Sequence, residues 1–184
     1  MDFKEMTLED IIWDNSQSPE GRKLLEERGL LIKGILFRQL DLGSYGRADL
    51  ISFSCGKEYI RFDVTIYELK KGRIGIDALL QAYRYLTALK RHGLETEGVV
   101  FYKIVLIGDS VEMNGDFLFL YNELENVTIY TYNYSITGIA FTELKKNWCK
   151  ADERFNDDTI ETIESELQSY YDELKKSEHH DSNK

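Results

Sequence analysis

The alternation of apolar and polar positions predicts a short helix and then three strands in the first part of the chain. An N-capping serine followed by proline, and a glycine one turn beyond the last apolar position, predict a helix over residues 19–28. Three β-rich runs follow, GILFRQLDLG, GRADLISFS and EYIRFDVTIYELK, separated by glycine-containing turns at residues 43–46 and 54–57. We expect a three-stranded meander.

Helical periodicity begins after the third run. Leu79, Ala82, Leu86 and Leu89 recur at the spacing of one helical face, which predicts a core-facing helix from Ile76 until a glycine ends it. The next run, VVFYKIVLIG, is continuously apolar, as in a buried central strand. A strand, a helix and a second buried strand indicate a parallel crossover. The sheet is therefore expected to be mixed.

The last third of the chain predicts a hairpin and one further helix. The runs at 127–133 and 136–144 have β-strand composition, and the segment 157–176 is acidic with one apolar stripe. The last eight residues are expected to be disordered. We therefore divide the chain into a compact α/β domain over residues 1–150 and a C-terminal acidic helix with its tail over residues 151–184.

Composition favours a folded, soluble protein. Of 184 residues, 42% are hydrophobic and 12% aromatic, and no apolar run is long enough to span a bilayer. The acidic beginning of the chain lacks the features of a secretory signal, so we expect a cytoplasmic location and no membrane partner. The two cysteines lie far apart and have no companions at zinc-ligand spacing.

Charge is distributed unevenly along the chain. The net charge is −10, yet residues 20–91 hold 14 Lys and Arg against 9 Asp and Glu, a local charge of +5. A local excess of Lys and Arg favours phosphate binding. Arg47, Lys71, Arg73 and Arg84 are the expected substrate contacts, although each alone is more often a solvated charge.

Three charged side chains are predicted to converge on one face of the meander. Glu68 and Lys70 are two residues apart at the end of the third strand and therefore point to the same side. Asp49, on the neighbouring strand, can lie beside Glu68, because antiparallel neighbours are about 5 Å apart. The alternatives without a functional role are that Asp49 accepts hydrogen bonds from the backbone amides of a turn and that Glu68 and Lys70 belong to a solvated strand face.

Two carboxylates at this range favour a bound cation. Hard oxygen ligands that leave open positions for water are typical of a Mg²⁺ or Mn²⁺ site. Such a metal ion neutralises a phosphodiester oxygen and lowers the pKa of a bound water, while the ammonium of Lys70 helps to place the nucleophile. The implied chemistry is phosphodiester hydrolysis.

These residues resemble the PD-(D/E)xK nuclease superfamily over about residues 19–108. GRADLISF is similar to its metal-binding aspartate strand, with Asp49 in that place, and YELKKG to its E-x-K strand, with Glu68 as the second ligand and Lys70 as the catalytic lysine. Ala48 stands where the family often has proline. The resemblance implies a restriction-endonuclease-like fold, in which a central mixed sheet is flanked by helices.

The subgroup similar to RecB-type exonucleases adds a Q-x-x-x-Y pattern on the next helix. Gln81 and Tyr85 fit this pattern in QAYRY and share one helical face, although both are also ordinary residues for a helix beside a core. The same subgroup places a glutamate on the first helix. Glu26 fits as a further metal ligand, and Glu27 is a rival for that role.

Two functions remain open at this point. The first is a metal-dependent endo- or exonuclease, with DNA as the expected substrate. The second is a catalytically silent nuclease-fold module that acts by binding a protein or nucleic-acid partner. The apolar stripe at 157–176 leaves open a homodimer or a protein partner through the C-terminal helix. Because Asp49, Glu68 and Lys70 are all present, the sequence favours the enzyme.

Overall fold

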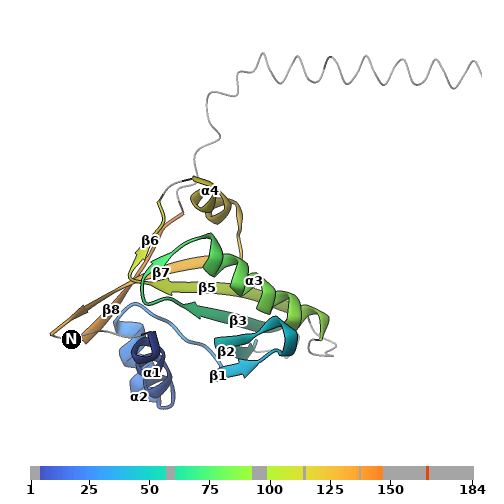
Figure 1. Ribbon diagram of the computed structural model, residues 1–184. Coiled ribbons are helices and arrows are strands. Elements are labelled where there is room, and N and C mark those ends of the chain that lie inside the picture. The colour runs from blue at the N-terminus through green and yellow to red at the C-terminus, as the bar shows by residue number, and fades with distance from the viewer. Residues whose placement is uncertain are drawn as a thin grey trace, which may run out of the picture. The chain divides into compact units, whose positions relative to one another are not determined.

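The computed structural model describes residues 5–56, 61–92, 99–113, 115–136 and 138–146, together with Ser165. The chain divides into two compact units, Met1–Lys146 and Asn147–Lys184. All helices and strands below belong to the first unit (Figure 1). They are α1 (Glu5–Ser16), α2 (Pro19–Glu27), β1 (Ile35–Asp41), the 3₁₀ turn η1 (Gly43–Tyr45), β2 (Arg47–Cys55), β3 (Arg61–Leu69), β4 (Arg73–Ile74), α3 (Ile76–Arg91), β5 (Val99–Gly108), β6 (Ser110–Val111), α4 (Gly115–Glu123), β7 (Val127–Ser135) and β8 (Gly138–Glu143).

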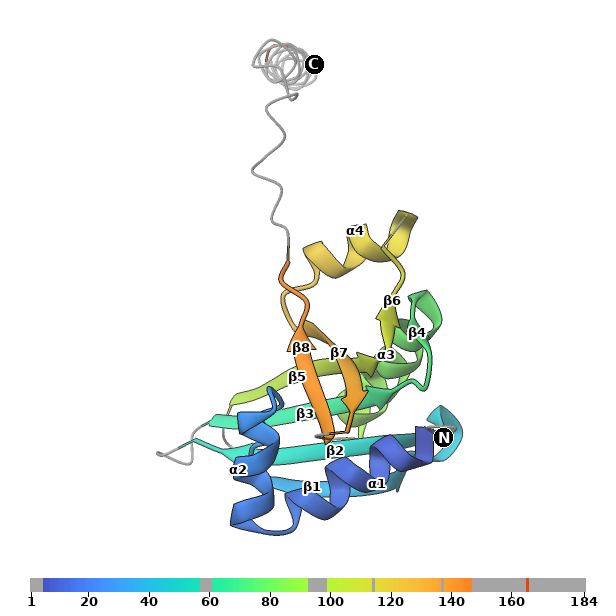
Figure 2. The same cartoon turned by 90° about the vertical axis from the view of Figure 1, so that its left-hand side faces the viewer.

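A mixed sheet in the order β1-β2-β3-β5-β7-β8 forms the centre of this unit. β1, β2 and β3 are an antiparallel meander, and β7 and β8 form an antiparallel hairpin, as the sequence predicted. β3, β5 and β7 are parallel, with α3 and α4 as the connections between them. Figure 2 shows how strongly β7 and β8 are twisted relative to the meander. The mixed α/β class is confirmed.

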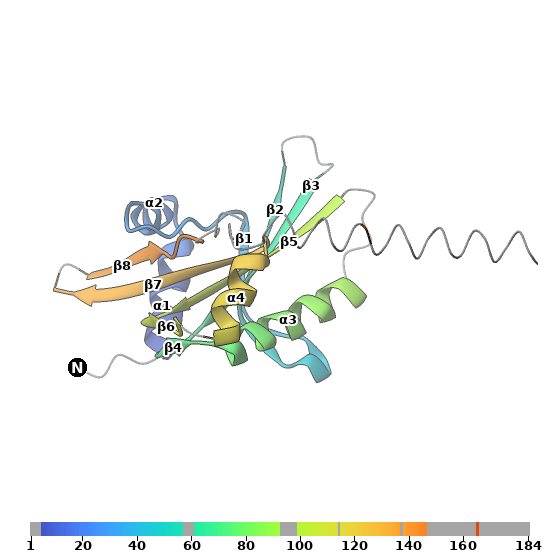
Figure 3. The ribbon, with the colours of Figure 1, turned by 90° about the horizontal axis from the view of Figure 1, so that it is seen from above.

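Helices cover the two faces of the sheet, and each face has its own core. α3 and α4 pack on one face over Val64, Ile66, Ile104 and Leu106. α1 and α2 pack on the other face, over a cluster that includes Leu69. Figure 3 shows α2 and α3 on opposite sides of the strands.

Local signals explain the predicted helices. The hydroxyl of Ser18 accepts a hydrogen bond from the amide of Gly21 at 3.0 Å, and Pro19 occupies the first helical position of α2. Gly29 follows the helix with a φ of 96°, a conformation that favours glycine. The helix predicted from Ile76 is observed as α3.

Three features were not predicted: α1, α4 and the short parallel pair of β4 with β6. The expected acidic helix at 157–176 and the tail beyond it lie outside the described residues, apart from Ser165. Residues 57–60, which include the end of the second predicted turn, also lie outside them. Among the described residues, no helix combines the length and apolarity needed to cross a membrane.

Candidate functional site

Asp49 lies where the hydrogen-bonded pairing of β2 with both neighbouring strands is interrupted. On one side, Arg38 pairs with Leu50 and Leu40 with Ala48, but the ladder skips the intervening pair of Gln39 and Asp49. On the other side, the ladder with β3 ends at Leu50. The carboxylate of Asp49 accepts the amide hydrogen of Leu69 at 2.9 Å, so a side chain replaces the next rung of the ladder.

The break on the β1 side has a visible cause. Gln39 has a φ of 51°, in the left-handed region that costs a non-glycine residue about 1–3 kcal/mol. Its side-chain amide donates to Oε2 of Glu9 at 2.8 Å, which ties the distorted residue to α1. The backbone beside Asp49 is thus held out of regular pairing.

Glu68 is the most buried charged group of the site. It is 1% exposed, and neither carboxylate oxygen reaches solvent. Continuing the β2–β3 register by one step places Glu68 opposite Asp49, on the sheet face covered by α3. Burying a carboxylate is costly unless a cation or hydrogen bonds compensate it.

Lys70 provides that cation. Its Nζ lies 2.7 Å from Oε1 of Glu68, and its side chain is 28% exposed. Its backbone amide donates to the carbonyl of Ile107 on β5 at 2.7 Å, which fixes the chain just beyond β3. The expected convergence of Glu68 and Lys70 is therefore observed, and the solvated-face alternative is wrong for Glu68.

A chain of hydrogen bonds continues from Lys70 to α3. Nζ donates to Oε1 of Gln81 at 3.2 Å, and Nε2 of Gln81 donates to the hydroxyl of Tyr85 at 2.7 Å. The structure thus joins the two residues of the Q-x-x-x-Y pattern to the E-x-K strand.

Tyr85 reports on the electrostatics of the site. Its side chain is 3% exposed, and burial raises the pKa of its phenol. The charges of Glu68 and Asp49 raise this pKa further, whereas Gln81 and Lys70 lower it. The charges of both carboxylates therefore act on the Tyr85 hydroxyl. With its pKa raised, this hydroxyl stays protonated at neutral pH.

The donor set of the site fits a hard divalent cation. Asp49 and Glu68 offer carboxylate oxygens from adjacent strands, and Mg²⁺ is commonly bound by one or two carboxylates together with waters and substrate phosphates. In the part of the chain that the structure describes, no group of three or more His, Cys, Asp or Glu side chains is arranged to hold a metal ion. Asp49 and Glu68 are the residues of this site that could hold such an ion.

The first-helix glutamate is not brought to this site. Glu26 and its rival Glu27 are exposed on α2, whose buried Leu25 packs on the face opposite α3. Glu9 of α1, which sequence reasoning did not single out, is 5% exposed and accepts hydrogen bonds from Arg38 and from Gln39, the residue across from Asp49. The signal for it in the sequence is an acidic residue directly after the apolar Leu8, with a second apolar residue, Ile12, one helical turn later.

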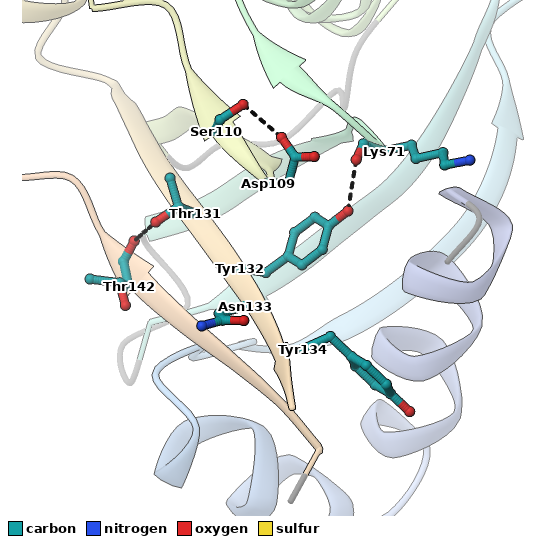
Figure 4. A pocket seen from close by; sticks show the side chains of 8 residues that line it. All are labelled: Lys71, Asp109, Ser110, Thr131, Tyr132, Asn133, Tyr134 and Thr142. Atoms are coloured by element: carbon teal, nitrogen blue, oxygen red, sulfur yellow. Dashed lines mark hydrogen bonds between the residues drawn. The ribbon is translucent and has the colours of Figure 1, made fainter. Parts of the chain in front are cut away.

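The four predicted substrate contacts are scattered. Arg47 is largely exposed and lies 3.9 Å from Asp41, and Arg84 is exposed on α3. Arg73 is exposed on β4. Lys71 is exposed beside the site lysine, but it lines a different cavity (Figure 4).

That cavity has a volume of about 740 Å³ and lies where β7 continues past the end of β5. Figure 4 shows the hydroxyl of Tyr132 bonded to the carbonyl of Lys71, and Ser110 bonded to Asp109. None of the lining residues belongs to the group formed by the two carboxylates, Lys70 and Gln81. We therefore place the candidate chemistry at the Asp49–Glu68 pair and not in this cavity.

In comparisons with known proteins, no family model, no curated protein and no solved structure matches this chain. The function must therefore be argued from the geometry of the site.

Proposed function

We propose that this protein is a metal-dependent nuclease that hydrolyses phosphodiester bonds, with DNA as its expected substrate. The observation that carries the proposal is the arrangement of Asp49 and Glu68 on one face of adjacent strands, with Nζ of Lys70 2.7 Å from Glu68. Two acids and an amine at the end of a buried strand suit phosphodiester chemistry.

The order of elements supports a restriction-endonuclease-like core. α2, the meander β1-β2-β3, α3 and the parallel strand β5 follow one another as in that fold. Asp49 is in the second strand and Glu68 at the end of the third, and Gln81 and Tyr85 lie on the helix that follows. The sequence resemblance and the topology therefore favour the same superfamily.

Asp49 and Glu68 are the residues that would hold Mg²⁺ or Mn²⁺. When bound, such an ion neutralises phosphate charge and makes a coordinated water more acidic. The protein contributes the position of both carboxylates. Asp49 is fixed by the amide of Leu69, and burial in the sheet fixes Glu68.

Lys70 and α3 complete the proposed site. The ammonium of Lys70 is oriented by both Glu68 and Gln81, which suits it to position the attacking water or to stabilise negative charge on the phosphate. Tyr85 accepts the amide hydrogen of Gln81, which leaves the amide oxygen turned towards Lys70. Gln81 and Tyr85 are therefore positioning residues for the lysine.

Cleavage of labelled nucleic acid tests this proposal. Single- and double-stranded DNA and RNA are incubated with the protein in Mg²⁺, Mn²⁺ or EDTA. Asp49→Asn and Glu68→Gln should each lower the metal-dependent rate by about 10²–10⁴-fold. Asp41→Asn, which removes a 69%-exposed carboxylate from the same meander, is the matched control and should cleave at the normal rate.

The controls separate the two functions that the sequence leaves open. Far-ultraviolet circular dichroism establishes that each variant is folded. Cleavage that Glu68→Gln leaves unchanged would point to a contaminating nuclease and contradict the assignment. A folded wild-type protein that cleaves none of the substrates with either metal would instead favour the silent binding module.

A further inference from the structure

A second cavity lies on the sheet face opposite the candidate nuclease site. The segment Leu30–Lys33, the turn at residues 125–126 and the strands β3, β5 and β7 enclose a volume of about 390 Å³. This volume is within the range of small-ligand sites. We call it the polar cavity.

The floor of the polar cavity is unlike the other face of the same strands. Towards α3, β3 presents Val64 and Ile66, which are fully packed in the core. Because side chains alternate along a strand, the alternate residues Arg61, Asp63 and Thr65 face the polar cavity on the other side. The apolar cluster beneath α1 and α2 includes Tyr67 and Leu69 of this strand but none of these three polar residues.

Two buried hydroxyl groups mark the inner end of the cavity. Tyr67 is 3% exposed and Ser52 is 2% exposed, and 3.5 Å separates their hydroxyl oxygens. Hydroxyl pairs normally bond at about 2.7–2.8 Å, so the bond to Ser52 is long, and the hydroxyl of Thr65 is the other side-chain partner of Tyr67. Tyr67 lines the cavity and can form a shorter bond to a ligand there.

Cationic side chains surround the outer part. Arg61, Lys33 and Lys103 line the cavity together with the acids Asp63 and Glu125. Arg61 is bonded to Asp63 at 2.9 Å. Within the described ranges, no ion pair engages Lys33 or Lys103, so two ammonium groups are available for an anion.

An aromatic surface lies next to these cations. Phe101 is 47% exposed, and the guanidinium of Arg61 lies 4.2 Å from the centre of its ring. Exposed aromatic rings and arginine planes are the surfaces on which nucleic-acid bases stack. The cavity thus combines a stacking surface, two ammonium groups that form no ion pair among the described residues, and deeper hydroxyls.

We propose that the polar cavity binds a nucleoside phosphate, either as a free nucleotide or as one unit of a single strand. The phosphate pairs with Lys33 and Lys103, the base stacks on the Arg61–Phe101 surface, and Tyr67 bonds to a polar group of the ligand. This site is separate from the proposed nuclease chemistry, because Glu68 points to the opposite face of β3.

Isothermal titration calorimetry of the full chain in EDTA tests the proposal. The probes are adenosine 5′-monophosphate, adenosine, inorganic phosphate and a single-stranded deoxyadenosine decamer. The monophosphate or the decamer should bind at micromolar concentration and more weakly at high salt, whereas adenosine and phosphate alone should bind much more weakly. Preference for the monophosphate identifies a free nucleotide, and preference for the decamer identifies a single strand.

Variants assign the binding to the cavity. Phe101→Leu should weaken binding by about tenfold or more, because it removes a stacking ring. Tyr67→Phe and Lys103→Met should each weaken it several-fold. Phe119→Leu, which removes a 64%-exposed ring from α4, and Lys23→Met, which removes a 76%-exposed ammonium from α2, are the matched controls and should bind normally.

Two results would overturn the proposal. The first is that neither the monophosphate nor the decamer binds better than adenosine or phosphate alone. The second is binding that Phe101→Leu and Tyr67→Phe leave unchanged. Because EDTA removes any metal-dependent cleavage from the measurement, these results are independent of whether the protein is a nuclease.

Discussion

The pairing of Glu68 with Lys70 can be tested through stability alone. Lys70→Met keeps most of the aliphatic chain but removes the ammonium 2.7 Å from Oε1 of Glu68. Breaking a fully buried ion pair costs about 3–5 kcal/mol, and an exposed pair contributes about 0–1 kcal/mol. Because Glu68 is 1% exposed and Lys70 28% exposed, we expect a loss of about 3 kcal/mol in the free energy of unfolding.

The assay is urea denaturation followed by circular dichroism in EDTA. In a thermal melt of a unit of this size, the same loss of about 3 kcal/mol corresponds to a fall of roughly 6–12 °C in the midpoint. The double variant Glu68→Gln, Lys70→Met removes both charges. It should be more stable than Lys70→Met by about 2 kcal/mol, because the carboxylate that required compensation is gone.

Metal provides the second arm of this test. In Lys70→Met, the two carboxylates of Asp49 and Glu68 remain without the charge of the lysine, so Mn²⁺ should stabilise this variant more than the wild type. The reasoning would be refuted if Lys70→Met lay within about 1 kcal/mol of the wild type. Strict additivity of the two single losses in the double variant would refute it equally.

Three further predictions concern the scaffold. Arg38→Met removes bonds of 2.5 Å to Glu9 and 2.6 Å to Asp10, and should lower the free energy of unfolding by about 2 kcal/mol in urea denaturation. Burial raises the pKa of Tyr67 above its ordinary 10.0, so its stabilising contribution is complete below pH 10 and is lost as the pH rises towards the folded-state pKa. Between pH 8 and 11, Tyr67→Phe should therefore lose less stability than the wild type; an equal loss would contradict this. Gly29 has a φ of 96°, and the Cβ of Gly29→Ala would lie 2.2 Å from a β8 carbonyl oxygen. Gly43 has a φ of 63° but open space around it, so Gly43→Ala should lower the free energy of unfolding by roughly 1 kcal/mol. Gly29→Ala should lower it by several times that amount.

The site residues that could be predicted from the sequence depend on simple periodicities. Strand alternation places Glu68 on the face of Val64 and Ile66, and helical spacing places Gln81 one turn from Tyr85. These rules act within one element, so they hold wherever the element forms.

The features that could not be predicted depend on contacts between elements. The position of Asp49 depends on the left-handed backbone of Gln39, which no propensity favours in a strand, and on its bond to Glu9. Among the α1 side chains whose burial the structure describes, Leu8 and Ile12 are the fully buried apolar ones, which is too little apolar periodicity to identify a helix beside an acidic beginning. Glu26, which the resemblance assigns as a ligand on the first predicted helix, is exposed on α2.

α4 was missed for a different reason. Its sequence, GDFLFLYNE, is a short and nearly continuous apolar run, which periodicity alone cannot assign to a helix or to a strand. Phe117 and Tyr121, one turn apart, are its buried residues. The packing of these two rings on the α3 face decides the matter, and that face exists only once the sheet has formed.

The energetic cost of the site is an argument for chemistry there. A buried carboxylate with its lysine can often be replaced by apolar residues without loss of stability, and sometimes with a gain. Here the protein buries Glu68, holds Lys70 through Gln81 and Tyr85, and interrupts both ladders at Asp49. Each of these features costs stability that an apolar strand end would keep, and together they place the carboxylates of Asp49 and Glu68 on adjacent strands at one face of the sheet. A binding role in which these groups take no part would leave that cost without a physical reason.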